Sequence, residues 1–133
     1  MDSPGSNVAI RPQISLREMG EVKAAGYVTV VNHRPDGEEP GQPTSESLAA
    51  EAGRLGLDYV WIPVSGFPDD AAVEATAAVL RRSSADRPVL MFCRSGMRST
   101  VAWARAMCAD GADPDAVRAA AAAAGYDLSR VPL

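Results

Sequence analysis

Residues 88–99 read PVLMFCRSGMRS, and this stretch carries the strongest structural signal in the chain. The run before Cys93 is apolar throughout, which predicts a strand covered on both faces. Gly96 then permits a sharp turn, and a helix is predicted from Ser99 to Ala109. A strand that turns directly into a helix is typical of α/β proteins, whose ligands gather at the carboxyl ends of the strands. Cys93 stands at such an end.

Helices and strands also alternate on both sides of this stretch. Ser15 and Glu18 have the spacing of a capping box, and Asp69 or Asp70 is expected to cap a later helix. The predicted strands are residues 27–31, 58–64 and 88–92, and the predicted helices are residues 16–25, 45–55, 70–82, 99–109 and 114–125. This order predicts an α/β fold with a central, mainly parallel sheet flanked by helices.

Chain length and composition predict a single domain. The chain has 133 residues, of which 47% are apolar, and this is enough to bury a core of ordinary size. Residues 1–9 are small, polar and unpatterned. We therefore expect them to form a flexible leader, and residues 10–133 to form the domain.

Charge and cysteine content exclude several classes of function. The formal net charge is −4, so no general attraction to nucleic acid or to anionic lipid is built into the chain. The sequence has no apolar run of the roughly 20 residues that cross a membrane. Two cysteines and the lack of a signal-peptide pattern at the start predict a reduced, cytoplasmic protein.

The loop after Cys93 has the composition of an anion site beside a nucleophile. Amides at a tight turn converge on an anion, and the start of the following helix adds partial positive charge. This field favours thiolate over thiol at Cys93, and Ser99 is in a position to hydrogen-bond the sulfur. The alternative is that Cys93 is a buried small hydrophobe in a solvated surface turn. The expected anion-binding residues of the loop are Arg94, Ser95, Gly96, Met97 and Arg98.

Candidate residues outside the loop carry weaker signals. Arg34 is expected to help hold the anion, with Asp36 or Glu38 orienting an arginine, and the alternative is a loop held by local salt bridges. Cys108 is either a resolving thiol or, as its alanine-rich surroundings favour, a core residue. Because His33 is the only histidine, we assign it no role and expect no metal site, no cofactor and no Cys-His-Asp triad.

Several separated blocks resemble one bacterial family. The blocks are FCRSGMRS at 92–99, NHRPDGE at 32–38, GQP at 41–43, YVWIPV at 59–64 and AGYDL at 124–128. They resemble the phosphatase-like domain of the β-lactamase hydrolase-like proteins, a family also described as sulfurtransferases. The resemblance implies the three-layer fold of the dual-specificity phosphatases. Relatives can be fused to a persulfide dioxygenase, so it also implies such a partner or a thiol acceptor in sulfide metabolism.

Three features depart from the pattern of true cysteine phosphatases. Four residues separate Cys93 from Arg98, whereas phosphatases have five, and four is the spacing of the rhodanese sulfurtransferase loop. Phe92 replaces the histidine that usually precedes the cysteine. Gly66 stands where phosphatases supply the aspartate that protonates the leaving alkoxide.

Sulfur transfer needs less from the protein than phosphoester hydrolysis. Asp69 or Asp70 could supply the missing acid, but both have the pattern of helix caps. Thiosulfate gives up sulfite, a stable dianion that needs no proton. The sequence therefore predicts a sulfurtransferase first, a cysteine phosphatase second and a noncatalytic anion-binding or regulatory domain third. The expected catalytic set is Cys93, Arg98, Ser99 and Asp69.

Overall fold

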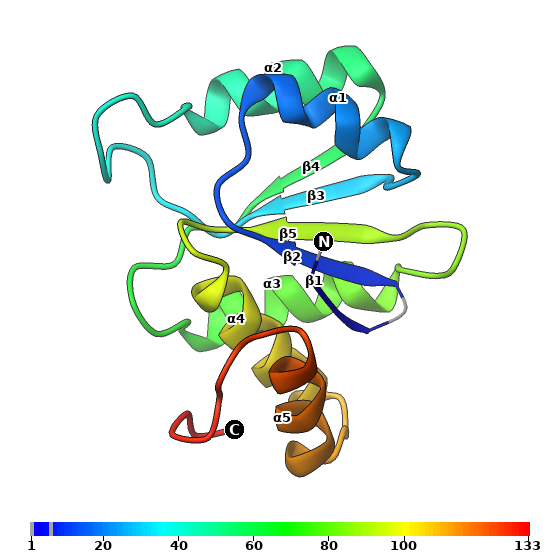
Figure 1. Cartoon of the computed structure of the whole chain (residues 1–133), viewed down its shortest axis with the longest axis vertical. Helices are drawn as coiled ribbons and strands as arrows, with labels where there is room; N and C mark the ends of the chain where they lie inside the picture. Colours follow the sequence, from blue (N-terminus) through cyan, green and yellow to red (C-terminus); the bar gives the residue numbers. More distant parts are fainter. Residues whose placement is uncertain (1, 6) are drawn as a thin grey trace.

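The computed structural model describes residues 2–5 and 7–133, and its centre is one sheet. The strand order is β1-β2-β5-β3-β4. Strands β2, β5, β3 and β4 run parallel, and β1 pairs antiparallel with β2 at one edge (Figure 1). The strands are β1 Asp2–Gly5, β2 Val8–Arg11, β3 Thr29–Asn32, β4 Asp58–Trp61 and β5 Val89–Phe92.

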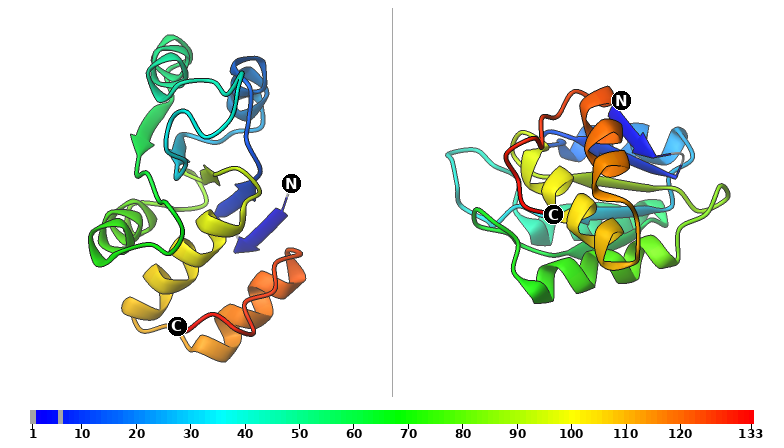
Figure 2. Two further views of the ribbon diagram at one scale, coloured as in Figure 1. Left: turned by 90° about the vertical axis from the view of Figure 1, so that its left-hand side faces the viewer. Right: turned by 90° about the horizontal axis from the view of Figure 1, so that it is seen from below.

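Helices cover both faces of this sheet and make three layers. Helices α1 and α2 lie on one face, α3 and α4 lie on the other, and α5 packs outside α4 (Figures 1 and 2). The helices are α1 Leu16–Ala24, α2 Ser45–Leu55, α3 Asp70–Arg81, α4 Met97–Ala109 and α5 Pro114–Ala123. The α/β class and the parallel sheet predicted from the sequence are confirmed.

The central strands β3 and β5 contribute to a core on each side of the sheet. Successive strand residues point to opposite faces. Val30 and Leu90 pack with residues of α1 and α2, whereas Val31 and Met91 pack with residues of α3 and α4. Cys93 follows Met91 by two positions, so its side chain is directed toward α3 and α4.

The predicted helix starts are present. Ser15 Oγ accepts a hydrogen bond from the Glu18 amide, and the Glu18 carboxylate accepts one from the Ser15 amide. Asp69, rather than Asp70, caps α3, and Asp113 caps α5. Each cap satisfies amide groups that the first turn of a helix leaves without a partner.

The amino-terminal segment differs from the prediction. Residues 2–5 and 8–9 lie in β1 and β2, which corrects the prediction of a leader outside the fold; residues 1 and 6 lie outside the described residues. Strand β1 was not expected because its sequence, DSPG, consists of residue types that are depleted or weak in strands, and β2 was not expected because its apolar run has only three residues, Val8, Ala9 and Ile10. The pairing of β2 with β5 holds it in the sheet. Helix α4 also begins at Met97, two residues before the predicted start.

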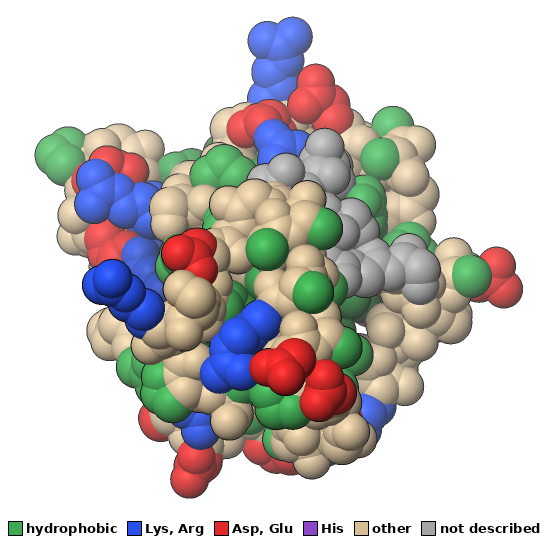
Figure 3. Space-filling view, turned by 60° about the horizontal axis from the view of Figure 1, so that its bottom comes forward, with side chains coloured by type: hydrophobic (Ala, Val, Ile, Leu, Met, Phe, Trp, Pro, Cys, Tyr) green, Lys and Arg blue, Asp and Glu red, His purple; other side chains and the backbone are tan. Residues whose placement is uncertain are grey.

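The surface carries charges of both signs. On the face shown in Figure 3, acidic and basic side chains lie close to one another. Charges that alternate in this way produce no extended field of one sign over that face. Within the described residues, no helix is both long enough and apolar enough to cross a bilayer.

Candidate active site

The loop after β5 places a cysteine at the carboxyl edge of the sheet. Strand β5 ends at Phe92, α4 begins at Met97, and Cys93 between them is fully buried. Gly96 has φ 96° and ψ −13°, a left-handed conformation that strains any other residue. A Cβ at Gly96 would also overlap the end of the Tyr126 ring. The loop therefore requires glycine at this position.

Several backbone amides of the loop remain available to a ligand. The Gly96 amide donates to Cys93 Sγ at 3.1 Å. Among the described residues, none accepts a hydrogen bond from the amides of Arg94, Ser95 or Arg98. These groups lie before or at the start of α4, where the helix adds partial positive charge. The loop is thus suited to bind an anion beside the sulfur.

Arg98 reaches from α4 to two neighbouring segments. Its Nη1 donates to Glu38 Oε2 at 2.9 Å and to the Val64 carbonyl at 2.7 Å, and its Nη2 donates to Glu38 Oε1 at 2.7 Å. Within the described chain, the Nε–H and the second Nη2–H have no partner. These two groups form one edge of the guanidinium, which has the geometry to bind two oxygens of one anion.

Glu38 joins two arginines. Its Oε1 also accepts from Arg34 Nε at 2.8 Å. Hydrogen bonds from Arg98 and then from Arg34 lower the pKa of Glu38 to about 2, so it is ionised at neutral pH and cannot act as an acid. Of the two acidic residues proposed to orient an arginine, Glu38 does so. Asp36 instead accepts from the Ser45 amide at 2.8 Å, at the start of α2.

The guanidinium of Arg34 is placed as the alternative of a loop held by local salt bridges predicts, and not as the expected anion ligand. The side chain is fully buried, and all three of its nitrogens already donate to the protein. Nε binds Glu38, Nη1 binds Gln13 Oε1 at 3.0 Å and Nη2 binds Glu39 Oε1 at 3.0 Å. The geometry therefore makes Arg34 a support for the Glu38–Arg98 pair rather than a direct anion ligand.

The other loop side chains lie at the surface. The Arg94 side chain is 63% exposed, and its Nη2 is 3.6 Å from Glu39 Oε2. Ser95 Oγ accepts from the Met97 amide at 3.3 Å, and both of these residues are exposed. Arg94 is free to turn toward a ligand, whereas Ser95, Gly96 and Met97 can contribute chiefly through their backbone.

His33 is the residue of this site that sequence reasoning missed. It is fully buried, with Nδ1 2.8 Å from Ser99 Oγ and Nε2 3.0 Å from Thr76 Oγ1. Burial and, to a smaller extent, Arg98 lower the pKa of His33 to about 3, so the imidazole is neutral. The available signal was its position, because His33 directly follows one strand as Cys93 follows another.

Ser99 does not make the predicted contact with the sulfur. Its hydroxyl lies against His33, and among the described residues no hydrogen bond joins it to Cys93 Sγ. The physical reason is the early start of α4. Because the helix begins at Met97, Ser99 is already in the first turn, on the side that faces α3 and β3.

Of the two candidate acids, Asp69 shares a hollow with a residue that contacts Arg98. Its Oδ1 accepts from the Ala72 amide at 2.8 Å, as expected of a helix cap. Asp69 and Val64 line the same hollow, of about 280 Å³, and the Val64 carbonyl binds Arg98. Asp70 is exposed and lines a different hollow together with Cys108.

Cys108 is too far from Cys93 to act as a resolving thiol. Helix α4 carries it about 16 Å along the axis beyond Met97. A disulfide requires Cα atoms within about 7 Å of each other. Cys108 packs at the edge of the core, and burial raises its pKa, in agreement with the core alternative.

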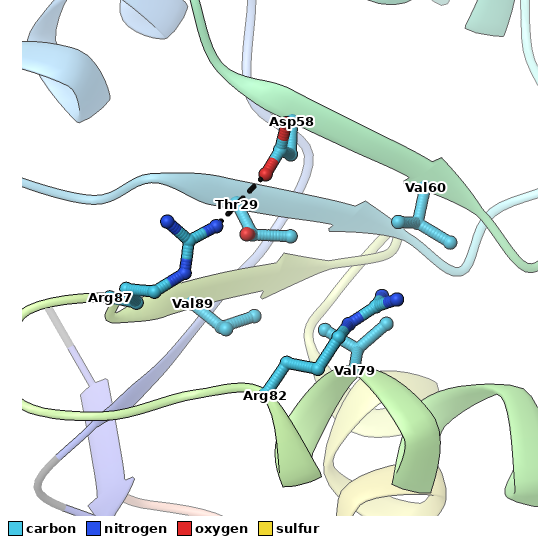
Figure 4. A pocket seen from close by; sticks show the side chains of 7 residues that line it. All are labelled: Thr29, Asp58, Val60, Val79, Arg82, Arg87 and Val89. Atoms are coloured by element: carbon cyan, nitrogen blue, oxygen red, sulfur yellow. Dashed lines mark hydrogen bonds and ion pairs between the residues drawn. The ribbon is translucent and has the colours of Figure 1, made fainter.

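A second hollow lies at the opposite edge of the sheet. Thr29, Asp58 and Val89 are the first residues of their strands, so it opens at the amino edge, away from Cys93. Asp58 and Arg87 form an ion pair there at 3.2 Å (Figure 4). The hollow has a volume of about 400 Å³ and is lined by Thr29, Asp58, Val60, Val79, Arg82, Arg87 and Val89. No group of three or more His, Cys, Asp or Glu side chains in the described residues is arranged to hold a metal ion.

Acid is expected to destabilise the protein through His33. Its pKa is about 3 in the folded protein against an ordinary value of 6.5. Below about pH 6.5 the unfolded chain therefore binds a proton that the folded protein does not, and stability is lost as the pH falls. The free energy of unfolding should decrease from about pH 6.5 toward pH 4, by at most about 1.4 kcal/mol per pH unit. Urea denaturation at a series of pH values measures this slope.

The control for this prediction uses the fact that the chain has one histidine. A His33→Gln variant should lose the slope between about pH 6.5 and pH 5, above the range in which carboxylates titrate. A slope that persists in the variant would assign the acid sensitivity to other groups. Below about pH 4.5, protonation of Glu38 adds a further loss, because its pKa is also lowered in the folded protein.

Comparison with known sequences identifies relatives over most of the chain. The family model of the phosphatase-like domain of beta-lactamase hydrolase-like proteins matches residues 4–111. A beta-lactamase hydrolase-like protein of Xylella fastidiosa is 36% identical over 126 residues, which is 92% of this chain and 28% of that relative. The chain thus spans little more than a quarter of the length of this curated relative.

Solved structures share the fold. A candidate phosphatase of Neisseria meningitidis is 26% identical, with a TM-score of 0.80 over 95% of this chain and 89% of that one. A kinase-associated phosphatase whose catalytic-site cysteine is replaced by serine has a TM-score of 0.67 at 17% identity, over 85% and 71% of the two chains. These likenesses confirm the predicted dual-specificity-phosphatase-like fold. By its match to the family model and to the Xylella protein, this chain belongs to the family of phosphatase-like domains of beta-lactamase hydrolase-like proteins.

Proposed function

We propose that this chain is a cysteine-dependent phosphatase that acts through a phosphocysteine at Cys93. The observation that carries the proposal is the loop geometry, in which a buried sulfur, free backbone amides and the free edge of Arg98 belong to one loop and the first turn of α4. The Neisseria relative, described as a candidate phosphatase, supports the phosphoryl group as the first choice. This choice reverses the order that the loop spacing alone predicts.

The reaction has two displacements at phosphorus. The Cys93 thiolate attacks the phosphorus of a phosphomonoester, the bond to the leaving oxygen breaks, and phosphocysteine forms. Water then attacks the same phosphorus, which releases inorganic phosphate and the thiolate. The loop amides and Arg98 stabilise the charge on the nonbridging oxygens in both steps.

The lack of a free acid to protonate the leaving group limits which phosphomonoesters can be substrates. Glu38 is ionised, and the Asp69 carboxylate is bound at the start of α3. An alkyl phosphate without an acid would have to leave as a poor alkoxide. We therefore expect the enzyme to prefer aryl or acyl phosphates, whose leaving groups are stable as anions.

Sulfur transfer is the second candidate, and one observation favours it. Four residues separate Cys93 from Arg98, which is the spacing of the rhodanese loop. In this reaction the thiolate attacks the outer sulfur of thiosulfate, the S–S bond breaks, and sulfite leaves with the electron pair. Cys93 then carries a persulfide; an acceptor thiolate attacks its outer sulfur, the S–S bond to Cys93 breaks, and the Cys93 thiolate is regenerated. No step needs an acid, so the engaged Asp69 carboxylate is no obstacle.

The two candidates separate in a pair of assays. We expect release of phosphate from p-nitrophenyl phosphate but very slow release from an alkyl phosphate. Asp69→Asn should reduce the aryl rate less than about 10-fold, since general acid catalysis is worth about 10²–10⁴-fold where it operates. Asp70→Asn is the matched control and should behave as the wild type.

The same preparation is then incubated with thiosulfate, and mass spectrometry measures the mass of the peptide that contains Cys93. A gain of one sulfur without phosphate release from any substrate would overturn the order of the two candidates. A loss of about 100-fold or more in Asp69→Asn alone would instead show that Asp69 is the acid and would remove the expected preference for aryl substrates.

A further inference from the structure

His33 lies beside Cys93 in the sheet, although neither proposed reaction uses it. Strands β3 and β5 are parallel with Asn32 opposite Phe92, and the His33 amide donates to the Phe92 carbonyl at 2.9 Å. His33 and Cys93 each follow by two positions a strand residue that packs on α3 and α4. Because side chains two positions apart point to the same face of a sheet, the imidazole and the sulfur are expected on one face, on neighbouring strands about 4.8 Å apart.

The positions of the hydrogens around His33 follow from its partners. Thr76 Oγ1 donates its one hydrogen to the Ala72 carbonyl at 2.8 Å, so it must accept at its contact with His33 Nε2. Nε2 therefore carries the imidazole hydrogen. Because buried His33 is neutral, Nδ1 carries none and accepts from the Ser99 hydroxyl at 2.8 Å.

We propose that His33 is a positioning residue that holds the hydroxyl hydrogen of Ser99 away from Cys93. The proposal rests on the function proposed above, because it concerns the same nucleophile. A hydroxyl that donated to the sulfur would stabilise its negative charge and make it a weaker nucleophile. With Ser99 committed to His33, the Gly96 amide is the donor that the described chain provides to the sulfur.

The other charged groups around Cys93 keep one charge state near neutral pH. Arg98 is the cation that acts on Cys93, and it remains charged. Arg34 is likewise a cation, and its partner Glu38 has a pKa of about 2. His33, with a pKa of about 3, is also outside the neutral range. The acidic residues within α3, Asp70 and Glu74, are exposed. A titration of Cys93 between about pH 5 and pH 9 therefore reports the sulfur itself.

The test is a titration of Cys93 by the ultraviolet absorbance of its thiolate, in a Cys108→Ser background that leaves one cysteine. Ser99→Ala should leave the pH midpoint of thiolate formation within about 0.3 units of the parent. His33→Leu should free the Ser99 hydroxyl to donate to the sulfur and lower the midpoint by about 1 unit. Thr76→Val, which removes only the partner of Nε2, should lower it by less, and the conservative Thr76→Ser should restore the parent value.

A rise of about 1 unit in Ser99→Ala would show that Ser99 already donates to the sulfur, and the proposal would be overturned. An unchanged midpoint in both Thr76→Val and His33→Leu would overturn it as well. Thr76→Val preserves the shape of the side chain, so it can be used for the test if His33→Leu fails to fold. The Ser99→Ala/Thr76→Val double variant should match Ser99→Ala, because a general loosening of the site would not need the Ser99 hydroxyl.

This test does not depend on turnover. If the midpoints behave as expected but neither phosphate nor sulfur is transferred, the proposed function fails and the role of His33 stands. If turnover is found but the midpoints do not respond, the role of His33 fails and the proposed function stands.

Discussion

Cys93→Ser is expected to lower turnover of an aryl phosphate by at least ~10⁴-fold, because a serine hydroxyl is a far weaker nucleophile than a thiolate at neutral pH. Anion binding should survive, since the free amides and Arg98 do not depend on the sulfur. Removing the negative sulfur also removes a repulsion, so inorganic phosphate should bind as tightly or slightly more tightly. Steady-state kinetics and calorimetric titration with phosphate measure the two effects.

Cys108→Ser is the matched control, because Cys108 lies at the far end of α4 and outside the loop. It should keep both turnover and phosphate binding. Turnover that persisted in Cys93→Ser would show that a contaminant causes the measured activity, and it would favour the noncatalytic anion-binding alternative. Loss of phosphate binding in Cys93→Ser, with the fold intact, would show that the loop is held open by the sulfur and not by its amides.

Positive and negative charges around the loop nearly balance, so the backbone amides are expected to contribute most to anion binding. Two acidic residues, Glu38 and Glu39, offset the buried Arg34 and Arg98, whose side chain is 19% exposed. Only Arg94 remains as an excess positive charge, and it is exposed to solvent and to salt. An anion is therefore attracted mainly by oriented amides and by the free edge of Arg98. Such donors select oxygen geometry more than net charge.

The part of the fold that positions Cys93 could be predicted because its signals are local. An apolar run, a glycine that takes a left-handed conformation and a following helix specify the strand, the turn and the helix without reference to the rest of the chain. Strands β1 and β2 gave no such signal. Val8, Ala9 and Ile10 form a strand that pairs with β5, and an apolar run of three residues after a polar segment does not predict that pairing.

Within the site, too, contacts inside one motif could be predicted, whereas contacts between distant segments could not. Cys93 and Arg98 belong to one short motif, so their proximity follows from the sequence. His33 follows β3, whereas Thr76 and Ser99 lie in α3 and α4, and only the packing of α3 and α4 on one face of the sheet brings them together. The ion pairs of Arg34 with Glu38 and Glu39 are local and agree with the salt-bridge alternative, whereas the contact with Gln13, 21 positions away, could not be predicted from the sequence.

Gly96→Ala is expected to lower turnover at least ~100-fold and to destabilise the protein by about 2–4 kcal/mol, from backbone strain and from overpacking. At φ 96° the alanine is strained, and its Cβ would overlap the end of the Tyr126 ring. Tyr126 Oη also donates to the Ser95 carbonyl at 3.4 Å, so a displaced ring would disturb the loop itself. The amide that binds Cys93 Sγ belongs to Gly96, and its position would change as well.

Gly111→Ala separates the effect of backbone strain from the effect of the overlap with Tyr126. Gly111 has φ 100°, but no atom lies within 4 Å of the position of its added Cβ. It should therefore cost only the strain, about 1–2 kcal/mol by urea denaturation, and leave turnover unchanged. Equal losses of stability in the two variants would show that Tyr126 moves aside without cost. Full turnover in Gly96→Ala would contradict the view that the loop amides must hold their positions around the anion.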